Sequence, residues 1–457
     1  MYDLLIAGGG IIGLTSAVSA ARRGMRVCLL DAASGPALET SFANAGELSF
    51  GYSGPWATPG ILRDVPGMLL DPRSPLRIRP DTSSFDAAVY QMKWLRWMAM
   101  NSKPSRFERN KRRIVDLSAY SKAARASFGV PPEQFDHRAR GTLQLFRDIK
   151  KFEATVAADE LVLRRSGVDF TVADAARCVE QEPALANIAE KIAGGLIFHA
   201  DETGDCYKFA VELAKIATNL GVELRWNTRV TSIKADRFVR GVATTRGDFA
   251  AAAVVLATGH WTRELAAPLG LKVPIYPVRG YSLTAPIANE EKAPVSTVLD
   301  QDSKVAITRF EGRIRAGGTA EVGGVSKPED VRRHSLLVDI VSTLFPGAIT
   351  TGAGAPITHW SGLRPMTPDG TPIVGATVCP GLYINAGHGT LGWTQSFGSA
   401  EFLGDVLIGA KPSLDPSQYA LARYGRWVRN TLFDFSSLTG PEPTGALERM
   451  SSTATWR

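Results

Sequence analysis

The segment Gly8-Gly9-Gly10-Ile11-Ile12-Gly13 decides the fold of this chain. It follows a short apolar run, residues 3–7, which is typical of a buried parallel strand. Residues 14–23 come next and predict a helix of small side chains. In this G-x-G-x-x-G pattern, Gly8 permits the turn, Gly10 lets a pyrophosphate approach the backbone, and Gly13 allows the helix to pack on the strand.

A second apolar strand is predicted over residues 26–30 and ends at Asp31. Asp31 stands about 18 residues after Gly13, close to the spacing at which an acid binds a ribose hydroxyl. The start of the helix offers free N–H groups to phosphates. We therefore predict a dinucleotide site; the alternative is that the glycines serve only the turn. Its predicted residues are Gly8, Gly10, Ile11, Ile12, Gly13 and Asp31.

Composition excludes several other classes of protein. With 457 residues, 44% hydrophobic and 21% charged, the chain can bury a large core, so disorder as a whole is excluded. A net charge of +7, without an aromatic-studded basic repeat, argues against a nucleic-acid partner. The four cysteines form no C-x-x-C pair and no metal-ligand spacing, so we expect no metal, no disulfide scaffold and a cytoplasmic location.

The cofactor is indicated by the way the later nucleotide-like segments are spaced. A helix over residues 207–219 precedes a strand over 221–227. A buried strand at 253–259 ends in Thr258-Gly259, and a glycine-rich turn follows much later, at 387–392. A nucleotide domain assembled from separated segments is typical of a flavoprotein rather than of a simple NAD dehydrogenase.

A family resemblance is carried by segments distributed from residue 1 to about residue 425. They are residues 39–46, 141–146, 201–206, 280–282, 293–297, 362–372 and 387–394. These segments resemble the D-amino-acid oxidase-like FAD superfamily and, within it, the bacterial D-amino-acid dehydrogenases of the small, flavin-carrying subunit type. The resemblance implies FAD, bound non-covalently, since Ser361-Gly362-Leu363-Arg364 fills the stretch where related sarcosine oxidases place a cysteine.

The resemblance also implies which segments surround the flavin ring. The loop from Ser41 to Gly46 would lie against the isoalloxazine, whereas the alternative is an ordinary turn. The turn before residue 394 would open a helix whose N–H groups stabilise negative charge on the ring; His388 would contact the ring or only bond the turn. The implied cofactor residues are Ser41, Asn44, Ala45, Gly46, Thr258, Gly259, Gly387, His388, Gly389, Thr390, Leu391 and Gly392.

Three side chains are candidates for substrate contact. Arg364 matches the family position whose guanidinium pairs with the substrate carboxylate, where a bidentate grip also fixes the α-carbon above the flavin. The alternative is an arginine that braces the turn at Pro365. Tyr281 and Tyr52 supply phenolic donors for the pocket, or are half-buried tyrosines of the structural framework.

The implied activity is oxidative deamination of D-amino acids to 2-oxo acids and ammonia. Hydride passes from the α-carbon to flavin N5, and the electrons go to a quinone-type or respiratory acceptor. One alternative is an oxidase or dehydrogenase of secondary amino acids such as proline, hydroxyproline or N-methyl amino acids. A second is a non-catalytic flavin-binding redox protein, against which Arg364 argues.

One segment bears on contact with a membrane. Residues 90–100 are rich in tryptophan and methionine, and five cations follow over residues 106–113. Such a stripe can rest on the anionic inner face of the cytoplasmic membrane. The alternative is an amphipathic core helix with a solvated basic face.

We predict an α/β fold with two interleaved units. A Rossmann-like FAD domain is expected over residues 1–60, 186–270 and 350–425. A substrate domain with a mixed, mainly antiparallel sheet is expected over 61–185 and 271–349, and residues 426–457 form a C-terminal tail.

Overall fold

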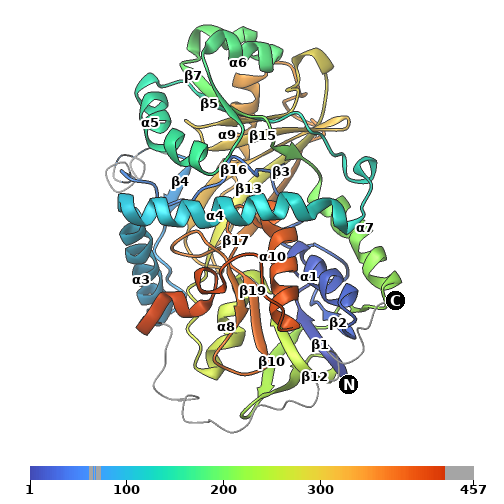
Figure 1. Ribbon diagram of the computed structural model, residues 1–457. Helices are drawn as coiled ribbons and strands as arrows, with labels where there is room; N and C mark the ends of the chain where they lie inside the picture. Colours follow the sequence, from blue (N-terminus) through green and yellow to red (C-terminus); the bar gives the residue numbers. More distant parts are fainter. Residues whose placement is uncertain (61–64, 66, 68–70, 72–73, 428–457) are drawn as a thin grey trace.

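The computed structural model describes residues 1–427, apart from 61–64, 66, 68–70, 72 and 73. The predicted tail, residues 426–457, lies outside the described residues except for its first two. Two large sheets dominate the described chain (Figure 1). The long helix α4, Pro104–Arg125, crosses between them.

The first sheet is the predicted nucleotide-binding sheet. It has eight strands, and its main path runs β10-β11-β12-β1-β2-β9, with β19 on β12 and β18 on β19. Strand β1 pairs in parallel with both β2 and β12, so its four residues from Leu4 to Ala7 are buried on both faces. The strands are β1 Tyr2–Ala7, β2 Val27–Leu30, β9 Glu223–Arg225, β10 Val230–Ala235, β11 Val239–Thr244, β12 Gly247–Leu256, β18 Ile373–Ala376 and β19 Leu382–Ala386.

Helices α1, Ile11–Arg22, and α10, Gly392–Leu407, pack against each other beside this sheet. Both are rich in Gly, Ala and Ser, and small side chains let the two backbones approach closely. Helix α10 also approaches α4 closely, since a Cβ added at Gly398 would lie 2.8 Å from the backbone nitrogen of Ser121. Helix α7, Cys206–Asn219, covers the other side of α1 and matches the predicted helix.

The second sheet is mixed and mainly antiparallel, as predicted. It has nine strands along the path β17-β13-β16-β15-β14-β5-β7-β6, with β4 beside β16. Its strands are β4 Leu76–Ile78, β5 Thr142–Phe146, β6 Phe170–Ala173, β7 Gly194–Phe198, β13 Tyr276–Pro286, β14 Thr297–Asp300, β15 Val305–Phe310, β16 Arg313–Val322 and β17 Thr358–Met366. Helices α5, Ile149–Arg165, α6, Ala175–Gln181, and α9, Arg332–Leu344, lie around it (Figure 1).

The strands do not follow the predicted domain boundaries everywhere. Residues 186–270 and 350–425 were expected in the FAD domain, yet β7 and β17 are hydrogen-bonded into the nine-stranded sheet. Strand β17 belongs to the nine-stranded sheet because all nine of its residues pair with β13. A small two-stranded sheet of β3, Glu47–Leu48, and β8, Glu202–Thr203, joins the two units.

The tryptophan-rich segment forms helix α3, Phe85–Asn101. Its two tryptophans pack against the protein: Trp94 is buried and stacks on Tyr276, and Trp97 stacks on Tyr424. Phe85 and Met92 are exposed. Within the described ranges, no helix combines the length and the apolar character that a membrane span requires. The short helix α8, Thr262–Ala266, completes the α-helices that Figure 1 labels.

Candidate functional site

A cavity of about 1080 Å³ lies between the two sheets. It extends from the glycine-rich turn after β1 to the nine-stranded sheet. The predicted cofactor residues and the three candidate substrate residues all line it, with the exception of Gly13. Folding therefore brings segments from residues 8–12, 31, 41–46, 52, 258–259, 281, 364 and 387–392 around one space.

The glycine-rich turn has the close contacts that its sequence pattern predicts. Gly8 has φ +109°, and a Cβ there would lie 2.5 Å from the carbonyl oxygen of Ala257. A Cβ at Gly13 would lie 1.8 Å from the carbonyl oxygen of Gly8, so Gly13 serves the packing of α1 on β1 and not the cavity wall. At Gly10 an added Cβ would meet only Ser41 Oγ, at 3.4 Å, and the backbone is open to a ligand.

Asp31 lies at the end of β2 and is held by the backbone. Its Oδ2 accepts a hydrogen bond from the N–H of Gly9, and its Oδ1 accepts one from Ala33. The carboxylate thus stands beside the glycine-rich turn, in the wall of the cavity. This is the place at which a ribose would follow the pyrophosphate.

The loop 39–46 is fastened to both units. Ser41 Oγ accepts a hydrogen bond from the N–H of Ile11 at 3.2 Å, which ties the loop to the start of α1. Thr40 Oγ1 donates to the carbonyl of Leu363 at 2.8 Å, and Ser282 Oγ donates to the carbonyl of Ala43 at 2.8 Å. The small residues of the loop therefore present backbone to the cavity from a fixed position.

The turn 387–392 leads into α10. Gly387 and Gly389 have φ +85° and +59°, which favour glycine, and neither the residue before α10 nor that before α1 caps its helix with a side chain. His388 lies in this turn and is buried; Nε2 stands 3.2 Å from Ser399 Oγ. Burial lowers the pKa of His388 to about 3, so the ring is neutral at physiological pH.

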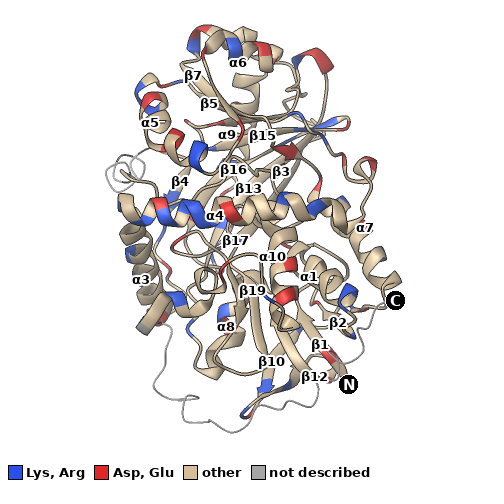
Figure 2. Cartoon of the chain, in the orientation of Figure 1, with Lys and Arg blue, Asp and Glu red and all other residues tan. Residues whose placement is uncertain are grey.

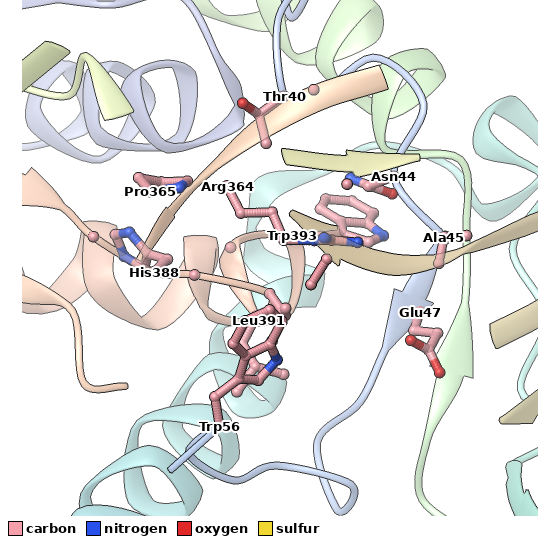
Figure 3. Close-up of a pocket in the computed structure, with 18 of the residues that line it drawn as sticks. Thr40, Asn44, Ala45, Glu47, Trp56, Arg364, Pro365, His388, Leu391 and Trp393 are labelled. Carbon is pink, nitrogen blue, oxygen red and sulfur yellow. The ribbon is translucent and has the colours of Figure 1, made fainter. Parts of the chain in front are cut away.

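Arg364 comes from β17 and its guanidinium reaches the carbonyl groups of β16. Nη1 donates to Thr319 O at 2.9 Å, and Nη2 lies 3.4 Å from Gly318 O. Burial alone lowers its pKa, to about 10, and no acidic side chain of the described chain pairs with it. Arg364 is therefore a desolvated cation without a counter-ion in the wall of the cavity (Figure 3).

The two tyrosines differ in what their hydroxyls contact. Tyr281 is buried; its hydroxyl donates to Glu321 at 3.0 Å and accepts from the N–H of Asp330 at 3.0 Å. These contacts favour a bracing role over substrate contact. The hydroxyl of Tyr52 accepts from Gln301 Nε2 at 3.1 Å in the same cavity. Both roles stay predictions.

Several ionisable residues of the cavity wall escaped the sequence analysis, Glu47 and His260 among them. Glu47 follows the predicted flavin loop directly, and its Oε1 is buried without a hydrogen-bond partner. Burial, and secondarily the charge of Asp201, raise the pKa of Glu47 to about 8. His260 is also buried, its Nε2 has no partner, and burial lowers its pKa to about 4. The sequence signal that could have identified Glu47 is its position directly after the loop 41–46.

The residues present fit a flavin dinucleotide. The open backbone at Gly10 and the uncapped start of α1 suit a pyrophosphate, and Asp31 suits a ribose. The loop 41–46 and the start of α10 supply flat backbone and free N–H groups at the far end of the same cavity. The cavity extends from one sheet to the other, which suits a ligand with a nucleotide at one end and a ring system at the other.

Comparison with known proteins defines the class. The model of the family described as "DAO: FAD dependent oxidoreductase" matches residues 3–406. The chain belongs to this family of FAD-dependent oxidoreductases, which confirms the expected fold class and cofactor.

The particular relatives are more specific. The chain is 45% identical over 428 residues to a D-amino acid dehydrogenase of Rhizobium johnstonii, covering 92% of this chain and 100% of the relative. It is 46% identical over 426 residues to a D-amino acid dehydrogenase of Cereibacter sphaeroides, covering 92% and 95%.

Solved structures support the fold. Glycine oxidase from Geobacillus kaustophilus superposes with a TM-score of 0.67 at 22% identity, covering 92% of this chain and 98% of the other. L-proline dehydrogenase from P. horikoshii gives 0.67 at 18% identity, covering 94% and 99%.

Proposed function

We propose that this protein is an FAD-dependent dehydrogenase that oxidatively deaminates D-amino acids to 2-oxo acids and ammonia. The resemblance to D-amino acid dehydrogenases over nearly the whole of their length supports the substrate class. The observation that carries the proposal is Arg364, a desolvated guanidinium that lines the cofactor cavity and pairs with no carboxylate of the described residues. A substrate carboxylate supplies the missing charge.

The chain's own residues bind, orient and exclude water. Arg364 holds the substrate carboxylate, and the carbonyl groups of Gly318 and Thr319 fix the direction of its guanidinium. Orientation of this kind lowers the barrier because the reacting bond is presented in one geometry. When bound, FAD supplies the acceptor for the two electrons and the hydrogen that leave the α-carbon. The buried, neutral His388 adds no charge to this site.

Anaerobic reduction of the bound flavin tests the activity directly. Purified protein is mixed with D-alanine, D-proline or L-amino acids, and bleaching of the flavin absorbance is followed. We expect D-alanine to bleach the flavin and L-alanine to leave it oxidised. If only D- or L-proline bleaches the flavin, the substrate is a secondary amino acid. If no amino acid of the panel bleaches it, a non-catalytic flavoprotein is favoured.

A variant at the carboxylate site sharpens this test. Arg364→Met should lower kcat/KM for D-alanine by about a hundredfold or more, because charge-assisted hydrogen bonds are lost and buried carbonyl groups are left unpaired. The matched control is Arg177→Met on the exposed face of α6, whose partner is Glu180. Equal activity of both variants would contradict the proposed role of Arg364.

For the electron acceptor we propose a quinone-type or respiratory carrier, reached from the membrane surface. Helix α3 exposes Phe85 and Met92, and exposed cations lie beside them and along α4 (Figure 2). Exposed apolar groups among cations suit an anionic bilayer. Turnover with a soluble quinone but not with oxygen would support the acceptor. Failure to co-sediment with anionic liposomes at low salt would contradict the membrane contact.

A further inference from the structure

Glu47 is an acid of the cavity wall whose chemistry the proposed reaction leaves unused. It lies on β3, where Glu47 pairs with Thr203 and Leu48 points into the hydrophobic core. Because side chains alternate along a strand, Glu47 faces the opposite way, into the cavity. Figure 3 shows the side chain of Glu47 apart from that of Arg364.

Among the residues that the structure describes, none supplies a positive charge that lowers the pKa of Glu47. Three lysines line the same cavity, and each has another partner. Lys111 lies 2.5 Å from Asp159, Lys151 lies 2.9 Å from Asp302, and Lys304 donates to Gln301. The Oε1 atom of Glu47 is shielded from solvent and accepts no hydrogen bond. A buried acceptor of this kind is costly unless a ligand satisfies it.

The charge of Glu47 acts on Tyr52 rather than on Arg364. The charge of Glu47 helps to raise the pKa of Tyr52, whereas burial alone shifts the pKa of Arg364. Tyr52 in turn receives a hydrogen bond from Gln301. The polar group of Glu47, Tyr52 and Gln301, hereafter the distal lobe, is therefore separate from the carboxylate grip.

We propose that Glu47 binds the positively charged end of a substrate side chain, so that the preferred substrates are D-amino acids bearing an ammonium or guanidinium group. This inference rests on the proposed function, because it takes the α-carboxylate to be held by Arg364. A long cationic side chain reaches from that grip toward the distal lobe and supplies the donor that Glu47 lacks. Tyr52 and Gln301 line its path.

The first test compares cationic substrates with neutral analogues of similar shape. Anaerobic flavin reduction is measured with D-lysine against D-norleucine and with D-arginine against D-citrulline. We expect the cationic member to be preferred by about tenfold to a hundredfold, since a charge-assisted hydrogen bond is lost in the neutral one. Glu47→Gln should abolish this preference and leave D-alanine near the wild-type rate. The control is Glu212→Gln, on the α7 surface.

The second test measures binding without turnover. 6-Aminohexanoate and hexanoate both carry a carboxylate for Arg364, lack an α-amine, and differ in a terminal ammonium. Perturbation of the flavin absorbance gives their affinities. In the wild-type protein, the preference for 6-aminohexanoate should rise between pH 6 and pH 9, because Glu47 ionises with a pKa of about 8. This measurement needs no variant, so it stands even if Glu47→Gln fails to fold.

The outcomes separate the two proposals. Equal use of cationic and neutral substrates, or a preference for 6-aminohexanoate that is flat with pH, would overturn the role of Glu47. A loss with D-alanine as large as that with D-lysine would place Glu47 at the α-amine and also overturn it. If no D-amino acid reduces the flavin but 6-aminohexanoate still binds more tightly through Glu47, the proposed function fails and the cation site stands.

Discussion

The guanidinium of Arg364 occupies the space that a side chain at Gly280 would need. A Cβ built on Gly280 would lie 2.2 Å from Arg364 Cζ and 2.2 Å from Nη1. Gly280 lies in β13, two residues from Val278, the partner of Arg364 across the ladder with β17. The glycine of the Gly280-Tyr281-Ser282 segment therefore makes room for the arginine of another segment 84 positions later, a relationship that only the sheet register creates.

Gly280→Ala tests this relationship. The backbone at Gly280 does not have positive φ, so alanine fits the strand but displaces the guanidinium. We expect KM for the D-amino acid substrate to rise and kcat/KM to fall by about tenfold to a hundredfold, as bidentate contact is lost. Steady-state kinetics with a dye acceptor give both values. Gly35→Ala, where an added Cβ meets only Leu38 at 3.8 Å, is the control and should be silent.

Gly13→Ala should reduce the content of bound flavin. The added methyl would lie 1.8 Å from the carbonyl oxygen of Gly8, so helix α1 must move away from the turn that it supports. Overpacking of this kind costs about 1–3 kcal/mol of stability. The absorbance ratio of flavin to protein and the Tm should both fall. A variant that keeps full flavin content would show that α1 can shift without disturbing the cofactor site.

Tyr281→Phe separates bracing from catalysis. The change removes the hydroxyl that donates to Glu321 and accepts from Asp330. Loss of these buried hydrogen bonds should lower the free energy of unfolding by about 1–3 kcal/mol and leave kcat/KM close to wild type. Denaturant unfolding and steady-state kinetics measure the two effects. A tenfold fall in kcat/KM at unchanged stability would instead place the hydroxyl on the substrate.

Titration of Glu182 should lower the free energy of unfolding at alkaline pH. It is fully buried and accepts hydrogen bonds from the backbone of Val295 and Ser296, and burial raises its pKa from 4.5 to about 7. A raised carboxyl pKa means that the folded state holds the proton more tightly. The resulting stability is full below pH 4.5 and is lost as the pH rises through 7.

Glu182→Gln removes this titration. Relative to wild type, the free energy of unfolding of the variant should be higher at pH 8 than at pH 5, by on the order of 2 kcal/mol. The Tm of the variant relative to wild type should rise in the same direction. Calorimetry at the two pH values measures it. Glu212→Gln, which pairs with Lys215 at the surface of α7, should show no such trend. A constant offset for Glu182→Gln would mean that its carboxyl is ionised throughout.

The nucleotide-binding half was predictable because its determinants are local. Gly8, Gly10 and Gly13 act within one turn, and Asp31 follows at the end of the next strand. The loop 41–46 and the turn 387–392 could be placed at the cofactor only through family resemblance. Nothing local to either segment states that both face one cavity.

The placement of β17 shows where the sequence was insufficient. Residues 350–425 were expected in the FAD domain, yet nine paired residues hold β17 on β13 in the other sheet. Tyr281 was singled out from its segment, but its hydroxyl direction follows from the packing of Glu321 and Asp330 around it. Glu47 was passed over because its strand partner in β8 and the charge of Asp201, which helps to raise its pKa, lie more than 150 residues away.

By itself, the sequence determined the cofactor-binding start and the flavoprotein class, and it singled out Arg364 as the candidate for the substrate carboxylate, because these features reside in short segments. The tertiary structure alone decided which side chains share the cavity and in what ionisation state. Burial sets those states: it lowers the pKa values of Arg364 and His388 and raises that of Glu47. Desolvation of a charge depends on all the atoms packed around it, and no linear pattern specifies that set.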